Sequence, residues 1–375
     1  MSLEVLGLST WSGEVTVTFY AKGYDPDPCK GKAVGSTSFH VDETSPVVTD
    51  GVLPVGPLHA GSYGYRATFE SKTYGLPDHP GECEPFEVLK NDTRTTTEVH
   101  DKHHDDVTGG AVPVGSTVHD QATVTELLAP YQPPSGFSPT GKVTFKFFEN
   151  GKCYGTPKDT EDKALSEYAS GVVESTPRTM TQPGAYSYLA IYSGSKDFEG
   201  SKGICEPFSV FQPGKTMGFW SNKNGEKRIV ENGGYAVNAA ILGRGSNIDT
   251  KDEATKVLPS PNACGKGTPF IFTVGAQTAS KDCTVASGNN ANSLNTLASQ
   301  TLALHYNRML IPGYDGQTLA MMGCSALATE GLTGSSTVGD AFGAAVEVIN
   351  LTTSANVQSR MGALNSLLGC LNREA

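Results

Sequence analysis

The chain has 375 residues, enough for two or three domains that each bury a core of their own. Its 39 acidic residues outnumber its 28 lysines and arginines, which gives a formal net charge of -11. Because no basic surface is available to neutralise phosphates, neither a nucleic-acid partner nor an anionic membrane is expected. No apolar run approaches the roughly 20 residues that span a bilayer, and the N-terminus does not resemble a signal peptide, so membrane insertion is not expected either.

Residues 1–90 predict a β domain made of short strands. Residues 14–20 alternate apolar and polar side chains, residues 61–70 do the same, and a closing strand begins at Phe86. The stretches between them are rich in Gly, Pro and Asp, which end strands and form turns. Many short strands of this kind favour an immunoglobulin-like β-sandwich.

Residues 91–213 repeat the first domain and add to it. The segment at 81–88, GECEPFEV, returns at 203–210 as GICEPFSV, and GEVTVTF returns as GKVTFKF. A period of well over a hundred residues indicates tandem domains. The second copy has two further strand-like stretches, residues 93–100 and 115–124, before the shared part. We therefore expect a complete immunoglobulin-like sandwich here and a first sandwich that lacks its opening strand or strands.

The missing part of the first domain has two explanations. In one, the sequence begins inside a larger protein, so that the upstream segment was cut off; we favour this because loss at a terminus needs no special mechanism. In the other, a neighbouring molecule donates the strand and the subunits polymerise, because an uncovered edge strand is a template for another chain. The residues expected at such an assembly edge are Leu3, Val5, Thr95, Thr97 and Val99.

The eight cysteines predict disulfides. Cys29 and Cys83 in the first copy match Cys153 and Cys205 in the second, which indicates one disulfide in each repeat. The remaining four allow three connectivities, of which we favour those that close compact local units: Cys264 with Cys283 and Cys324 with Cys370. A cysteine zinc site is disfavoured because the chain has no Cys-x-x-Cys pair. Disulfides predict an oxidising, extracellular or cell-surface location.

One stretch has the composition of a metal site. His100, His103, His104 and Asp105 lie within six residues, and His119-Asp120 follows nearby. Imidazoles and carboxylates bind zinc or calcium, and the end of a β-strand can gather them. The alternative is a solvated turn between two strands, which we favour because no recognised ligand spacing is present. No other cofactor is expected.

The second copy resembles a known family. It contains PTGKVTFKFF at 139–148, NGKC at 150–153, GAYSY at 184–188 and CEPF at 205–208. With these motifs, residues 3–212 resemble the bacterial Ig-like repeats of large secreted and cell-surface proteins. The resemblance implies structural spacers or adhesion stalks and supplies no catalytic residues.

Residues 214–375 predict a mainly helical domain with a small β-like insertion. Apolar residues recur at helical spacing in three segments: 294–309, 338–349 and 357–371. Residues 270–274 predict a strand of a hairpin. The opening motif GFWSNKNG at 218–225 resembles a C-terminal module that follows β repeats in bacterial surface proteins. Its Phe219 and Trp220 either line a carbohydrate or peptide pocket or anchor the core.

The sequence predicts no enzyme, because it holds no nucleophile elbow, metalloprotease helix or phosphate-binding loop. Two functions remain, and an enzyme is left only as a third alternative whose site would be assembled from residues that show no sequence motif. The first is a non-catalytic extracellular structural protein that associates with itself or with other surface proteins, as a fibre subunit whose first sandwich is completed by strand donation. The second is an adhesin-like stalk with a C-terminal head that binds a glycan or a protein.

Overall fold

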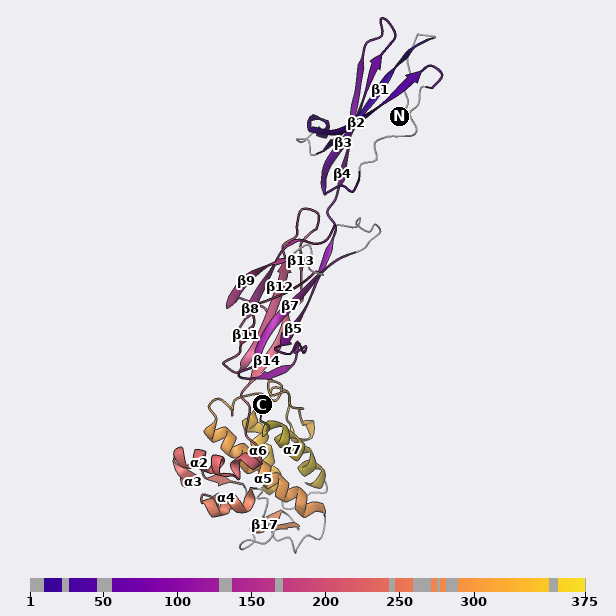
Figure 1. Cartoon of the computed structure of the whole chain (residues 1–375). Coiled ribbons are helices and arrows are strands. Elements are labelled where there is room, and N and C mark those ends of the chain that lie inside the picture. The colour runs from indigo at the N-terminus through magenta and orange to yellow at the C-terminus, as the bar shows by residue number, and fades with distance from the viewer. Residues whose placement is uncertain are drawn as a thin grey trace.

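A computed structural model shows three units that follow one another in an extended row (Figure 1). It describes residues 10–21, 27–45, 56–127, 137–165, 171–242, 247–258, 271–274, 277–280, 289–350 and 357–374. The first two units consist of strands and the third consists mainly of helices. The prediction of a multidomain, β-rich chain with a helical C-terminal part is therefore confirmed at this level.

The described residues of the first unit form one antiparallel sheet with the order β2-β1-β3-β4. Its elements are β1 (Ser12–Ala21), the 3₁₀ turn η1 (Pro28–Lys30), β2 (Lys32–Asp42), β3 (Gly61–Ser71) and β4 (His79–Val88). Along β1 every second residue is buried, as the alternating sequence predicts. Where we expected a sandwich without its opening strand, the described residues hold a single sheet.

The second unit has two sheets. Its strands are β5 (Thr93–Asp101), β6 (Ala111–Pro113), β7 (Thr117–Glu126), β8 (Gly141–Phe148), β9 (Asp159–Leu165), β10 (Val172–Glu174), β11 (Arg178–Thr179), β12 (Gly184–Tyr192), β13 (Ser201–Lys202) and β14 (Glu206–Phe211). One sheet has the order β6-β14-β12-β8-β9, with β13 paired to β12. In the other, β7 pairs with β5, β10 and β11. Apolar side chains of both sheets meet in two clusters between them.

The sheet of the first unit corresponds to four strands of the larger sheet in the second. Phe19 is opposite Tyr65 on β1 and β3, and Phe147 is opposite Tyr188 on β8 and β12. The disulfides correspond too: Cys29–Cys83 and Cys153–Cys205 have Cα separations of 5.8 and 5.7 Å. The repeat in the sequence is thus a repeat in strand register. What the second unit has in addition is the layer that contains β5 and β7.

The third unit packs short helices around α5. Its helices are α1 (Met217–Trp220), α2 (Lys223–Glu231), α3 (Gly234–Val237), α4 (Lys251–Val257), α5 (Asn289–Leu310), α6 (Val338–Asn350) and α7 (Val357–Leu371), with the 3₁₀ turn η2 (Ala328–Glu330). Two strand pairs join them: β15 (Ala240–Ile241) with β16 (Asn247–Ile248), and β17 (Ile271–Val274) with β18 (Gln277–Ser280). The three predicted apolar stripes lie on α5, α6 and α7, and together they form the core. Met309 departs from its stripe and is exposed.

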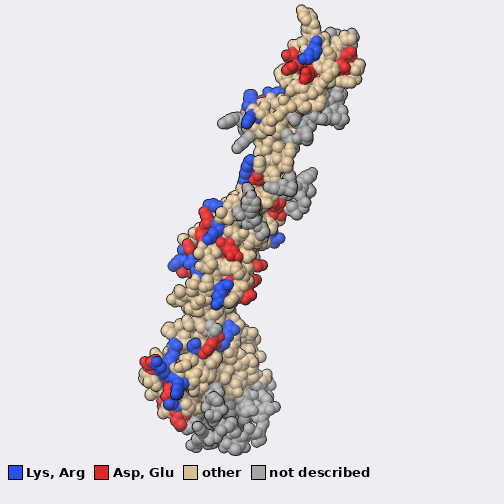
Figure 2. Space-filling model, in the orientation of Figure 1, with Lys and Arg blue, Asp and Glu red and all other residues tan. Residues whose placement is uncertain are grey.

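A third disulfide joins Cys324 to Cys370 and ties the loop before η2 to α7. The predicted partners Cys264 and Cys283 lie outside the described residues. None of the helices in the described part of the chain is both long enough and apolar enough to span a bilayer. On the face shown in Figure 2, acidic and basic side chains are interspersed along the molecule, and no large area carries one sign alone.

Two junctions connect the units. Between the first and second, the carboxylate of Asp197 accepts a hydrogen bond from the backbone N–H of Ala60 and lies 2.8 Å from Nδ1 of His59. Between the second and third, Gln317 donates to the carbonyl of Gln212 at 3.1 Å, and Phe211 at the end of β14 belongs to the helical core. The second junction is therefore an apolar contact as well as a polar one.

Candidate functional site

A ladder of four aromatic rings crosses the inner face of the sheet in both β units. In the second unit Tyr186 and Tyr188 lie between Phe147 and Phe208, with ring centroids 5.0 to 6.1 Å apart. Side chains of the opposite layer cover this ladder, among them Val99. The same four positions in the first unit carry rings at centroid distances of 5.1 to 5.9 Å: Phe19, Tyr63, Tyr65 and Phe86.

The two ladders differ in what covers them. Phe208 is 2% exposed, whereas its counterpart Phe86 is 37% exposed. Glu206, two residues before Phe208, is buried, and its counterpart Glu84 is exposed. Among the described residues, no second sheet lies over β1 to β4. The part of this face at β4 is therefore an open apolar surface with a carboxylate beside it, and β4 is an edge strand.

A pair of carboxyl groups is buried between the two sheets of the second unit. Asp120 on β7 is fully buried, and Glu206 on β14 is 1% exposed. Neither oxygen of the Asp120 carboxyl has a hydrogen-bond partner among the described residues. Burial, reinforced by the neighbouring carboxyl of Glu206, raises the pKa of Asp120 well above its usual value. Burial likewise raises the pKa of Glu206 to about 7.

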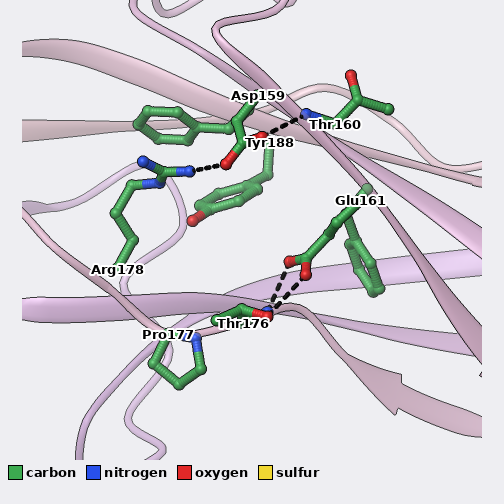
Figure 3. Close-up of a pocket in the computed structure, with 9 residues that line it drawn as sticks. Asp159, Thr160, Glu161, Thr176, Pro177, Arg178 and Tyr188 are labelled. Atoms are coloured by element: carbon green, nitrogen blue, oxygen red, sulfur yellow. Dashed lines mark hydrogen bonds and ion pairs between the residues drawn. The ribbon is translucent and has the colours of Figure 1, made fainter.

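A polar cavity of about 300 Å³ opens beside this pair, between β9 and the segment that leads into β11. Figure 3 shows Arg178 paired with Asp159, and Glu161 bonded to Thr176. The Arg178 guanidinium also lies 4.5 Å from the ring centroid of Phe147.

Two polar atoms of residues that line this cavity are themselves buried. Nε of Arg178 and the hydroxyl of Tyr188 have no hydrogen-bond partner among the described residues. Burial raises the pKa of Tyr188 to about 12, so that its hydroxyl stays protonated.

Three histidines meet at one end of the same unit. His100 ends β5, His104 lies in the loop after it, and His119 is on β7; one ring nitrogen from each lies within 4.8 Å of the others. Glu174 on β10 lies 3.8 Å from both His104 Nδ1 and His119 Nε2. His100 and His119 are buried, and burial lowers the pKa of His119, which keeps its imidazole neutral. Neutral imidazoles have a lone pair for a metal ion.

The structure corrects the predicted ligand set. His100 and His104 belong to the cluster, but His103 and Asp105 are exposed in the loop and do not join it. His119, which the sequence places 15 residues beyond His104, is brought in because β5 and β7 pair and set His100 opposite His119. Nothing in the sequence pointed to Glu174, which reaches the cluster only through the pairing of β10 with β7.

The predicted assembly edge is placed in part. Thr95, Thr97 and Val99 lie on β5, which among the described strands pairs with β7 alone, so β5 is an edge strand of its layer. Their side chains point inward and are buried. Leu3 and Val5 lie outside the described residues.

The GFWSNKNG motif is structural. Trp220 is 1% exposed and donates its indole N–H to Asn307 at 3.0 Å, so of its two expected roles it has that of a core anchor and does not line a binding pocket. Phe219 is half-buried against Lys215. Asn222 caps α2. A Cβ on Gly225 would come within 2.4 Å of the Phe219 carbonyl oxygen, so glycine allows α1 and α2 to approach closely.

His305, the histidine of the helical unit, is a core residue. Its ring is buried on α5, and its Nε2 lies 3.1 Å from the carbonyl oxygen of Asn238. Burial lowers the pKa of His305, so that the ring is neutral. These contacts make His305 a packed residue beside the apolar stripe of α5.

Comparison with known proteins identifies no family for this chain. No family model matches the sequence, and no curated protein matches it. Among solved structures, a red sea bream transglutaminase matches with 12% identity, over 55% of this chain and 28% of that protein, at a TM-score of 0.20. The chain thus spans less than a third of that protein. Because this structural neighbour is an enzyme, the prediction that the chain is not an enzyme is contradicted and withdrawn; at this TM-score the likeness supports no particular activity.

Proposed function

We propose that this chain is an extracellular or cell-surface structural protein of the bacterial Ig-like repeat kind, and that its first unit is an assembly surface. The observation that supports this most is the contrast between Phe86 and Phe208, which have the same place in the two repeats but are 37% and 2% exposed. In the first repeat the β4 end of this apolar face is open at Phe86, although Phe19 and Tyr63 of the same ladder are buried, and an apolar edge that is covered in the other repeat fits a site for another chain.

Three further features support the extracellular role. The described part of the chain has three disulfides, and such bonds persist in oxidising compartments. Tandem β units in an extended row, as Figure 1 shows, suit a spacer. The register shared by the two repeats, together with the two layers of the second, agrees with the resemblance to Ig-like domains.

How copies of this chain would associate depends on whether one copy can donate strands to the next. Among the described residues, the layer that the first unit lacks is formed by β5, β7, β10 and β11, and in each copy these strands already cover the second unit. A copy that donated them would uncover its own second unit, so strand exchange leaves one uncovered apolar surface for every chain. Two first units packed against each other at the Phe86 end of this face bury both exposed parts at once. We therefore propose a two-fold dimer through the first unit in place of a fibre.

The test is sedimentation of the full chain over a range of concentrations, with and without a peptide of residues 93–126. A dimer that the peptide converts to a peptide-bound monomer supports the proposal. The substitution Phe86→Ser should weaken the dimer, and Tyr74→Ser, which removes an exposed ring in the turn after β3, should not. Filaments would point to strand donation instead, and monomers at every concentration would refute self-association through this face.

The alternative, a stalk with a helical head that binds a glycan or protein, has weaker support. Its proposed aromatic anchor Trp220 is a core residue. The cavity beside Arg178 is lined by charged and hydroxyl side chains of the kind that bind glycans, and it lies in the second β unit. A glycan array with wild-type protein and with Arg178→Gln tests this; binding that Arg178→Gln does not reduce would exclude the cavity.

A further inference from the structure

Four side chains from four separate segments converge at one end of the second unit. His100, His104 and His119 place one ring nitrogen each within 4.8 Å of the other two. Their rings meet edge to face, with centroids 4.9 to 6.0 Å apart. The carboxylate of Glu174 lies 3.8 Å from His104 and from His119. From this convergence we propose that His100, His104, His119 and Glu174 form a zinc-binding site.

The state of His119 supports a ligand at this place. Its side chain is 5% exposed, and its Nε2 is buried with no hydrogen-bond partner among the described residues. A buried polar nitrogen without a hydrogen-bond partner destabilises the folded state. The separation of 3.8 Å from Glu174 is too long for a hydrogen bond. A metal ion between the two would satisfy both atoms.

The two distances from Glu174 are close to those between ligands of one ion, and the three ring nitrogens lie within 4.8 Å of one another. Two donors bound tetrahedrally at zinc's usual bond lengths lie about 3.4 Å apart. His104 and Glu174 are exposed and free to rotate by the few tenths of an ångström that separate 3.8 Å from this value. His104 has a backbone φ of 62°, in the left-handed region that histidine adopts more readily than most residues. Glu98 lies 3.3 Å from Nε2 of His100, and such carboxylates orient metal-bound imidazoles.

The ligand types select the metal. Three imidazoles and one carboxylate are typical of zinc and other late first-row divalent ions, and calcium requires six or more oxygen ligands. Four protein ligands fill a tetrahedral ion, so the site has a structural character. Zinc would tie the loop after β5 to β7 and to the strand β10, and it would stabilise the second unit as any ligand of the folded state does.

The loop after β5, which holds both His103 and His104, provides a matched control. His104→Asn removes a ligand while keeping a residue that tolerates the left-handed conformation. His103→Asn makes the same change one residue earlier, outside the cluster. Full-length wild type, both variants and Glu174→Gln would be stripped of metal with a chelator and titrated with zinc by calorimetry. Cobalt would be used as a spectroscopic substitute, because tetrahedral nitrogen and oxygen ligation gives visible absorption.

We expect one zinc ion per chain for wild type and for His103→Asn, and an affinity about tenfold or more lower for His104→Asn and Glu174→Gln. The cobalt absorption should fall in the same two variants, and excess calcium should not displace zinc. The proposal is overturned by absence of zinc binding in wild type, by equal binding in His103→Asn and His104→Asn, or by displacement by calcium. It does not depend on the assembly proposed above.

Discussion

Replacing Glu206 by glutamine should stabilise the second unit at neutral and alkaline pH. Glu206 and Asp120 are two carboxyl groups without a cation beside them in the described structure, enclosed between two sheets. Burial favours the protonated form of each, so the folded state holds protons that the unfolded chain releases. Glutamine has nearly the same shape as the protonated acid and carries no charge at any pH.

The direction and size of the change in unfolding free energy with pH follow from the pKa of Glu206, which is raised from an ordinary 4.5 to about 7. A raised folded-state pKa gives stability that is complete below pH 4.5 and is lost as the pH rises through 7. Each pKa unit corresponds to about 1.4 kcal/mol, so the second unit should lose about 3 kcal/mol across this interval. Asp120, whose pKa is also raised, acts in the same direction.

The assay is equilibrium unfolding in urea at several pH values, read by a short deuterium pulse and mass spectrometry on peptides from β12. This readout reports on the second unit alone. Tryptophan fluorescence would not, because the second unit contains no tryptophan. Wild type should become less stable from about pH 5 to about pH 8, and Glu206→Gln should exceed it by about 3 kcal/mol at the upper end.

The control is Glu84→Gln, which alters the same motif position in the first repeat, where the side chain is exposed. It should leave the pH dependence of the second unit unchanged. A wild-type stability that is flat or rises over this range, or a Glu206→Gln variant that is equally destabilised at both ends, would refute the reasoning.

Three further experiments test the fold. Phe208→Ala should lower the unfolding free energy of the second unit in urea by about 3–5 kcal/mol. Phe86→Ala should lower that of the first unit much less, because of these two side chains only Phe208 is fully enclosed. Equal losses would mean that Phe86 is covered as well. Gly225→Ala should cost the helical unit about 1–3 kcal/mol by circular dichroism, since its new Cβ meets backbone atoms, and an unchanged midpoint would contradict that contact. Removal of the Cys153–Cys205 disulfide, whose partners are 52 residues apart, should cost about 4 kcal/mol of unfolding free energy, and a loss below about 1 kcal/mol would mean that it barely constrains the unfolded chain.

Much of the architecture was predictable because it depends on local periodicity. Alternation along residues 14–20 predicts a strand with one buried face, and β1 has this pattern. The helical stripe at 357–371 predicts α7, whose Leu364 and Leu368 are in the core. The matched cysteines predicted the pairs that the structure joins, since equivalent positions in two repeats occupy equivalent places in the strand register.

The sites depended on tertiary structure, because they join residues whose proximity no local pattern encodes. His119 and Glu174 reach His100 only through the pairing of β7 with β5 and β10. In sequence, Glu84 and Glu206 occupy the same Cys-Glu-Pro-Phe motif and are indistinguishable. The second layer buries the carboxyl of Glu206 and raises its affinity for a proton, whereas Glu84 stays in water. Burial depends on what packs against a strand, and the strand's own residues do not specify this.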